Sequence, residues 1–311
     1  MRAVVVRSFG GPEVLEIANV AVPAPGRGQV RIRMTAASVN PVDLATRSGA
    51  LTEAGLVEPR EVLGIGWDVA GEIDALGQET TGFSLGDNVI GLSDRFDVSL
   101  GTHAEYVVLD ASAVALAPRG TPATEAATLP LNGLTARQAL DVVGLGPGQT
   151  LLVTGAAGAV GGFAVQLAVA RGLRVVAVAG ARDEALVRSL GAEFFVPRNA
   201  SLADAVREFV PGGTHGVIDA AVLGVRALSA VRGGGAFVSV VAGGTPVPLR
   251  GVRVSAVWTR ADGTQLAELV KLVEADAVTL RVANVHPLAE VALAHERLGR
   301  GGLRGRLVLV P

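Results

Sequence analysis

The pattern of hydrophobic and polar positions changes about one third of the way along the chain. Up to about residue 117, brief apolar or β-branched runs alternate with Gly, Pro, Asp and Asn, which is typical of short strands joined by turns. These runs predict strands at Val4–Val6, Gln29–Met34, Ala70–Leu76, Asn88–Gly91 and Glu105–Leu109. The first segment is therefore expected to be a β-rich module.

From about residue 120 short apolar runs alternate with longer helical stretches. The predicted strands are Leu151–Thr154, Arg174–Val178, Glu193–Val196, Gly216–Ala220 and Ala236–Val241. The predicted helices between them include Ala159–Arg171, Asp183–Leu190 and Ser201–Val210. This alternation indicates a parallel sheet covered on both faces. The tail adds two predicted helices, near 263–275 and 287–299, and a closing strand at Arg306–Val310.

Composition narrows the classes of protein. At 311 residues the chain is long enough for about two domains. Half of its residues are apolar and 18% are charged, which excludes intrinsic disorder. A net charge of −2 offers no basic surface, so nucleic acid is not an expected partner. The absence of cysteine excludes disulfides, thiolate catalysis and cysteine-ligated zinc, but leaves the redox compartment open.

No targeting or membrane segment is expected. The apolar run at the start is too short for a signal peptide and is interrupted by Arg7, so a cytoplasmic protein is expected. Residues 142–170 carry no charge, but Pro147 and several glycines break them. A strand, a glycine turn and a buried helix explain this stretch better than a membrane span.

The strongest chemical signal is the segment LLVTGAAGAVGG at 151–162. Gly155 permits a tight turn after a strand, Gly158 allows the backbone close to a pyrophosphate, and Gly161 lets the next helix pack closely. The helix N-terminus presents N–H groups and a positive dipole end to the phosphates. The spacing departs from G-x-G-x-x-G, so the placement between strand and helix carries the prediction. The residues predicted to bind are Gly155, Ala157, Gly158, Ala159, Val160 and Gly161.

The end of the next strand indicates which dinucleotide binds. Residues 175–182 contain no Asp or Glu, which in an NAD site accepts from the adenosine ribose hydroxyls. Gly180 and Arg182 stand there instead, and Arg198 follows the third strand. An arginine suits a 2′-phosphate through charge-assisted hydrogen bonds. The alternative is that Arg182 is a solvated residue at a helix start. These residues favour NADPH over NADH.

Further motifs occur in a specific order along nearly the whole chain. They are ASVNPVD at 37–43, RSG at 47–49, GWDVAGE at 66–72, GDNV at 86–89, GTHAEY at 101–106, LPLNGLTA at 129–136, the glycine turn, HPL at 286–288 and LRGRLVL at 303–309. Together they resemble the zinc-independent, quinone oxidoreductase-like branch of the medium-chain dehydrogenase/reductase superfamily.

The resemblance implies an α/β protein of two domains. A GroES-like β-domain would comprise 1–117 and 253–311, and a Rossmann domain with a doubly wound parallel sheet would comprise 118–252. The active site would be the cleft between them, and the protein would be a homodimer paired through the Rossmann sheet. The resemblance also implies that Thr135 lies near the nicotinamide and that Ala242 and Gly243 contact its carboxamide edge.

Three departures from the wider superfamily are informative. Trp67 stands where zinc-dependent members have a histidine ligand, and Asn40 where they have a cysteine, so no metal is expected. The aromatic residue common in quinone oxidoreductases after the Asn-x-x-Asp pair is replaced by Leu44, Ala45 and Thr46. The only tyrosine, Tyr106, lies in a predicted core strand, so a tyrosine proton donor is not expected.

Asn40 is the first candidate for a catalytic, substrate-binding residue. Its amide would donate to the oxygen of a conjugated carbonyl that accepts hydride, Trp67 would form an apolar wall of the substrate site, and solvent would deliver the proton. Equally, Asn40 would simply form a turn before Pro41, and Trp67 would belong to the core. Asp43 and Arg47 are expected to form a structural i, i+4 pair.

Other polar residues are given structural roles. Asp68 is expected to orient a local turn, and His295 to lie on a helix surface. His103, His215 and His286 are assigned to a strand, a loop and a turn, without chemistry.

The sequence therefore leaves three hypotheses. The first is an NADPH-dependent reductase of quinones or α,β-unsaturated carbonyl compounds, which are small-molecule substrates. The second is a biosynthetic tailoring enzyme on the same scaffold, such as an enoyl reductase. The third is a non-catalytic NADPH-binding sensor or structural protein, in which an Asn40→Ala change would have no measurable effect.

Overall fold

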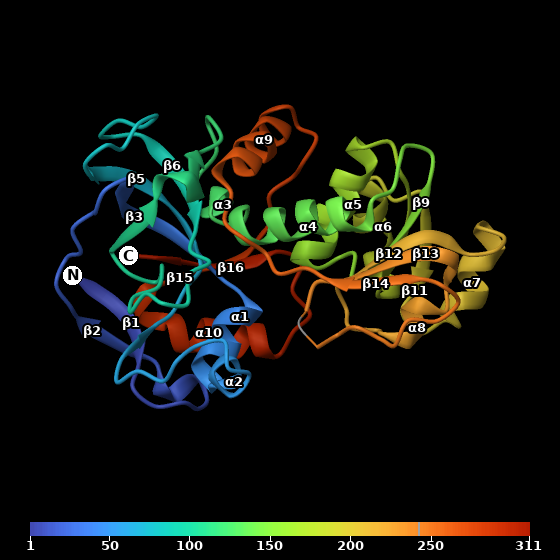
Figure 1. Ribbon diagram of the computed structural model, residues 1–311, viewed down its shortest axis with the longest axis horizontal. Coiled ribbons are helices and arrows are strands. Elements are labelled where there is room, and N and C mark those ends of the chain that lie inside the picture. Colours follow the sequence, from blue (N-terminus) through green and yellow to red (C-terminus); the bar gives the residue numbers. More distant parts are fainter. Residues whose placement is uncertain (242) are drawn as a thin grey trace. The chain divides into compact units, whose positions relative to one another are not determined.

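The computed structural model describes residues 1–241 and 243–311 (Figure 1). Contacts between Cα atoms divide the chain into two compact units. The first comprises Met1–Leu131, Arg260–Glu274 and Leu280–Pro311, and the second comprises Asn132–Thr259 and Ala275–Thr279. The main boundaries between the units therefore lie after residues 131 and 259, whereas the domain boundaries inferred from the sequence lie after residues 117 and 252.

The first unit is built on two sheets of mainly antiparallel strands. The smaller has the strand order β2-β1-β4, and the larger has the order β15-β16-β3-β5-β6-β8, with β7 also paired to β3. In the larger sheet β16 runs antiparallel to β3 and parallel to β15. The strands are β1 (Arg2–Val6), β2 (Glu16–Asn19), β3 (Gln29–Val39), β4 (Leu63–Gly64), β5 (Asp68–Leu76), β6 (Asn88–Leu92), β7 (Tyr106–Asp110), β8 (Val114–Leu116), β15 (Val282–Pro287) and β16 (Arg306–Val310).

Strand β3 shows why the alternating sequence forms this sheet. Val30, Ile32 and Met34 point into the core, and the arginines between them point outward. Arg31 pairs with Asp74 and Arg33 with Glu72, both on the antiparallel neighbour β5. Beyond Met34 the strand is longer than predicted, and its buried end carries Ser38 into the polar cluster described below.

The first unit also contains three short helices that were not predicted from the sequence, α1 (Pro41–Ser48), α2 (Ala50–Glu53) and α3 (Ala123–Ala126). The predicted helix near 263–275 is present as α9 (Gly263–Glu274). Near the C-terminus the predicted helix near 287–299 is present as a 3-10 helix at Leu288–Glu290 followed by α10 (Val291–Gly299). The strand before it, β15, was not predicted from the sequence. Residues 282–287 are a strand because they pair along β16.

The second unit contains a parallel sheet with the order β11-β10-β9-β12-β13-β14, as the alternation predicts. Its strands are β9 (Thr150–Thr154), β10 (Arg174–Ala179), β11 (Phe194–Pro197), β12 (Thr214–Asp219), β13 (Val231–Ser239) and β14 (Arg253–Ala256). Helices α5 (Ala159–Ala170), α6 (Glu184–Ser189), α7 (Leu202–Phe209) and α8 (Val225–Leu228) pack on these strands. The order reverses between β9 and β12, and a crevice at such a point is where doubly wound sheets bind ligands. The predicted α/β fold is confirmed.

The uncharged stretch 142–170 forms the end of α4 (Pro130–Val143), then β9, a turn and α5. Strand β9 is buried along its whole length, and α5 is buried over most of its length. Within 1–241 and 243–311, no helix combines the length and apolar character needed to cross a membrane.

Candidate active site

The glycine turn joins β9 to α5 in the form that the sequence predicts. Gly155 has φ +60°, a left-handed conformation that suits glycine. The amide of Gly158 donates to the carbonyl oxygen of Gly155 at 2.8 Å, which closes the turn. Helix α5 then begins at Ala159, and its first turn is closed by the Gly162 amide donating to the Gly158 carbonyl at 3.0 Å.

Glycine keeps this turn open, because a side chain at Gly158 or Gly161 would crowd its backbone. A Cβ atom at Gly161 would stand 2.2 Å from the carbonyl oxygen of Gly155, and one at Gly158 would stand 3.1 Å from the same atom. The amides of Ala159, Val160 and Gly161 precede the first hydrogen bond within α5, so they lie where a helix binds anions. The turn therefore fits the pyrophosphate of a dinucleotide.

Arginines gather beyond the end of β10. Arg182 is exposed in the turn Ala181–Asp183, and the side chain of Arg198 is 69% exposed. The guanidinium of Arg198 lies over Gly180, since a Cβ there would stand 3.1 Å from its Nη2. Arg226 on α8 adds a third arginine, whose Nη2 donates to the carbonyl oxygen of Arg198 at 3.4 Å. Sequence reasoning missed Arg226, because only the fold brings α8 beside the loop after β11.

A carboxylate also lies at this position. This carboxylate belongs to Asp183, which is 4% exposed. Its Oδ2 atom lies 4.0 Å from Arg198 Nη2 and would lie 3.0 Å from a Cβ atom added to Gly180. Strand β10 itself ends without Asp or Glu, as noted from the sequence, but Asp183 comes back to its end through the intervening turn. The site therefore holds both an acceptor suited to ribose hydroxyls and cations suited to a phosphate.

The remaining residues predicted for the cofactor lie on other elements of the second unit. Thr135 on α4 is 5% exposed, and its Oγ1 lies 2.7 Å from Thr259 Oγ1. Gly243 is an exposed turn residue with φ +75°. Ala242 lies outside the described residues.

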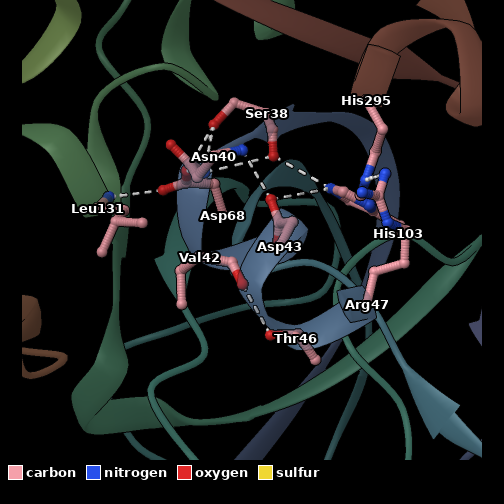
Figure 2. Close-up of polar contacts among 10 residues, drawn as sticks. All are labelled: Ser38, Asn40, Val42, Asp43, Thr46, Arg47, Asp68, His103, Leu131 and His295. Atoms are coloured by element: carbon pink, nitrogen blue, oxygen red, sulfur yellow. Dashed lines mark hydrogen bonds and ion pairs between the residues drawn. The ribbon is translucent and has the colours of Figure 1, made fainter. Parts of the chain in front are cut away.

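A buried polar cluster in the first unit surrounds Asn40 (Figure 2). The Nδ2 atom of Asn40 donates to Asp68 Oδ2 at 2.5 Å, and more weakly to Ser38, with its Oγ at 3.2 Å and its carbonyl oxygen at 3.4 Å. The same Asp68 oxygen accepts from Ser38 Oγ at 2.5 Å. The other oxygen accepts from the backbone amide of Leu131, at the start of α4, at 2.5 Å. Asp68 thus binds three segments, which is more than the local turn expected of it.

Asn40 also begins α1. Its backbone amide donates to Asp43 Oδ2 at 2.6 Å, which forms one arm of a capping box. The side chains of Asn40, Asp43 and Asp68 are all fully buried. Both oxygens of Asp68 and the Oδ2 atom of Asp43 are hydrogen-bonded, which makes their burial tolerable, whereas Asp43 Oδ1 has no hydrogen-bond partner among the described residues.

Burial dominates the titration of this cluster. It raises the pKa of Asp43 to about 7, against the opposing effects of the Asn40 amide and the positive charge of Arg306. It raises the pKa of Asp68 to about 6, against the hydrogen bond from Ser38. It also lowers the pKa of His103 to about 4 and that of His295 to about 3, so both histidines are neutral at neutral pH.

Three expectations about this region were wrong. His103 lies not in a strand but in a bend, one residue before the isolated bridge between Ala3 and Ala104. Arg47 does not pair with Asp43: its Nε donates to the carbonyl oxygen of Gly10, and its Nη1 lies 3.4 Å from His295 Nδ1. His295 is not on a helix surface but 1% exposed, because α10 packs that face against α1. Its ring lies edge-to-face with His103, with 6.3 Å between centroids.

Trp67 is half-buried and lines a small hollow of the first unit. Its ring meets Phe96 edge-to-face with 5.3 Å between centroids, and Thr46, Ser93 and Arg95 also line the hollow. Phe96 therefore forms an aromatic side of this hollow next to Trp67, and no role was predicted for it from the sequence. Tyr106 is only half-buried, and Arg31 lies over its ring at 5.6 Å.

Metal ligands do not gather in the part of the chain that the structure describes. No group of three or more His, Cys, Asp or Glu residues there is arranged to hold a metal ion. The chain also has no cysteine.

Comparison with protein families identifies two matching segments. Residues 26–119 match the alcohol dehydrogenase GroES-like domain, and residues 190–309 match a family described as zinc-binding dehydrogenase.

Relatives match over the full chain. The human protein named quinone oxidoreductase is 31% identical over 100% of this chain and 98% of its own. The tomato (Solanum lycopersicum) 2-methylene-furan-3-one reductase is 31% identical over 100% of this chain and 79% of its own.

Solved structures agree in fold. A crystal structure of an NAD-dependent alcohol dehydrogenase has a TM-score of 0.90 and 30% identity, and covers 100% of both chains. A mycobacterial protein solved in complex with NADPH has a TM-score of 0.85 and 30% identity, again over 100% of both chains. The chain therefore belongs to the quinone oxidoreductase-like branch of the medium-chain dehydrogenase/reductase superfamily.

Proposed function

We propose that this protein is an NADPH-dependent reductase that transfers hydride to a quinone or an α,β-unsaturated carbonyl compound without zinc. The observation that carries the proposal is the cradle of Gly155, Gly158 and Gly161, at the point where the strand order of the parallel sheet reverses. Membership of a family that contains quinone oxidoreductases supports the same reading. The reductase from tomato supports an enone as the alternative acceptor.

The chain's own residues would bind, orient and stabilise charge. When bound, the dihydronicotinamide supplies the hydride. As hydride reaches carbon, the carbonyl oxygen of the substrate becomes negative, and a hydrogen-bond donor there stabilises the transition state. We assign this donor to the N–H of Asn40 that faces Ser38, since its bonds of 3.2 and 3.4 Å are weaker than the bond to Asp68. Because Asn40 is fully buried, this role requires the surrounding residues to open when substrate binds.

The preference for NADPH rests on Arg182, Arg198 and Arg226. Three cations around one strand end suit the 2′-phosphate that distinguishes NADPH from NADH. Asp183 opposes this preference, but its carboxylate faces Arg198 and is therefore partly neutralised. The relative solved with NADPH supports the assignment.

A homodimer is part of the proposal. Strand β14 pairs with β13 and is last in the strand order, so it offers an edge to a second copy. Trp258, two residues beyond β14, is 58% exposed, as an interface residue would be in the isolated chain. Sedimentation of the Trp258→Ala variant should then show more monomer than the wild-type protein.

The test is turnover with defined acceptors. Purified protein mixed with NADPH should oxidise it in the presence of 1,4-benzoquinone, 9,10-phenanthrenequinone or a simple enone, and more slowly with NADH. Binding of NADPH without turnover on any acceptor would favour the non-catalytic alternative. Turnover confined to enoyl thioesters would favour the biosynthetic enoyl reductase.

A further inference from the structure

Val222 has a backbone conformation that its residue type avoids. Its φ is +54°, in the left-handed region where a β-branched residue is a clear outlier. Three other described residues besides glycine share a positive φ, namely Glu79, Arg250 and Asp276, and none of them is branched at Cβ. The conformation at Val222 therefore needs a cause in its surroundings.

The surroundings hold this conformation through Asp219, at the end of β12. Its Oδ1 accepts from Thr154 Oγ1 at 2.5 Å and from the Leu223 amide at 3.1 Å, and its Oδ2 accepts from the Gly224 amide at 2.8 Å. The Thr154 hydroxyl in turn accepts from the Ala221 amide at 3.0 Å. A buried carboxylate thus fixes the backbone on both sides of Val222. Strain that is held in this way is typical of functional sites.

The loop occupies a specific place at the ligand-binding edge of the sheet. It follows β12, the strand beside β9, and the carbonyl oxygen of Ala220 would stand 3.2 Å from a Cβ on Gly155. On its other side, Val222 Cγ1 would stand 3.3 Å from a Cβ on Gly244. In a doubly wound sheet the adenosine half of a dinucleotide lies toward β10 and the pyrophosphate lies at the β9–α5 turn. The loop after β12 therefore faces the half that follows the pyrophosphate.

We propose that Val222 is a binding residue for the nicotinamide half of the cofactor, and that Asp219 maintains the strained backbone to present it. The side chain is 52% exposed, although a valine in an unstrained loop would gain by turning inward. The inference rests on the proposed binding of NADPH, since it assigns a contact within that site.

Two substitutions separate the side chain from the strain. Val222→Gly removes both, so its melting temperature should rise by about 3 °C, while the Kd for NADPH rises about fivefold or more. Val222→Ala keeps a Cβ in the strained position and removes the isopropyl contact. Its melting temperature should stay near that of the wild type, and its Kd for NADPH should rise similarly.

A second ligand and a control variant make the test specific. Adenosine 2′,5′-bisphosphate lacks the nicotinamide half, so both variants should bind it with the wild-type Kd in calorimetry. Asp276→Gly relieves a positive φ of +55° at an exposed position and should raise stability without changing either Kd. Wild-type protein that does not bind NADPH would reject the proposed function itself. Wild-type binding that both Val222 variants retain, or an equal loss of the bisphosphate, would overturn the inference about Val222 alone.

Discussion

Asp68 and Asn40 share a buried hydrogen bond of 2.5 Å, in which the carboxylate Oδ2 accepts from the amide Nδ2 (Figure 2). The bond fixes which way the amide of Asn40 points, because reversing the amide would place its oxygen against a carboxylate. It is also charge-assisted and out of contact with water, so it is stronger than an ordinary surface bond. The orientation of the candidate donor thus depends on Asp68.

Exchanging the side chains of Asn40 and Asp68 should separate their effect on the free energy of unfolding from their effect on kcat. Asp68→Asn alone leaves donors facing donors and should lower the free energy of unfolding by about 2–3 kcal/mol. The double variant Asn40→Asp/Asp68→Asn restores a donor–acceptor pair with reversed polarity, so denaturant unfolding should recover most of that loss. Its kcat should stay at least tenfold low, because a carboxylate then faces the substrate oxygen. If the double variant regained full kcat, the donor role of Asn40 would have to be abandoned.

Stability should depend on pH through Asp43 and His103 in opposite ways. The folded pKa of Asp43 is raised to about 7, so its contribution to stability is complete below about pH 4 and disappears as the pH rises to 7. The folded pKa of His103 is lowered to about 4, so its contribution is complete above about pH 6.5 and disappears as the pH falls to 4.

The Asp43→Asn variant isolates the first effect. Asparagine cannot ionise, so the unfolding free energy of the wild type relative to this variant should decrease by a few kcal/mol between pH 4 and 7 and then level off. Urea titrations at half-unit pH intervals measure the difference. A flat difference across this range would show that Asp43 does not titrate inside the folded protein.

Gly161→Ala should disrupt the phosphate cradle. The added methyl group would stand 2.2 Å from the carbonyl oxygen of Gly155 and 2.9 Å from Ala156 Cα, which are backbone atoms that move only with the whole turn. We expect a loss of about 1–3 kcal/mol in stability and at least a tenfold rise in the Kd for NADPH. Gly146→Ala is the matched control, since nothing lies within 4 Å of its added Cβ. An unchanged Kd in Gly161→Ala would place the pyrophosphate elsewhere.

Arg198→Ala should weaken NADPH specifically. Removing one cation from a phosphate site should raise the Kd for NADPH about tenfold and leave that for NADH nearly unchanged. Arg226→Ala should act in the same direction. Arg188→Ala, which breaks a surface pair with Glu184 and a hydrogen bond to the carbonyl oxygen of Glu193, should affect neither cofactor. Parallel losses for NADPH and NADH in Arg198→Ala would point to a general structural role for this arginine.

Local features of the site could be predicted from the sequence, whereas long-range ones could not. The glycine turn is encoded within twelve consecutive residues, and each glycine has a separate steric reason. By contrast, Asp68 meets Leu131 across 63 positions and Arg47 meets His295 across 248. The helical periodicity around His295 does not indicate which face of α10 is covered by α1. The strained φ of Val222 is also not visible in the sequence, because it depends on hydrogen bonds among Asp219, the backbone beside Val222 and Thr154, which lies 65 positions before Asp219.

The last strand, β16, lies between β15 and β3 and carries Arg306, whose charge offsets that of Asp43. Residues 1–131 are synthesised long before β16. The strands of the parallel sheet, which end at residue 256, are also synthesised before it. The N-terminal segment must therefore wait, with an open sheet edge and an uncompensated carboxyl group, until the final residues emerge. A chain that ends near residue 280 would thus contain every strand of the parallel sheet but lack β15 and β16, which leaves the end of β3 without its antiparallel neighbour.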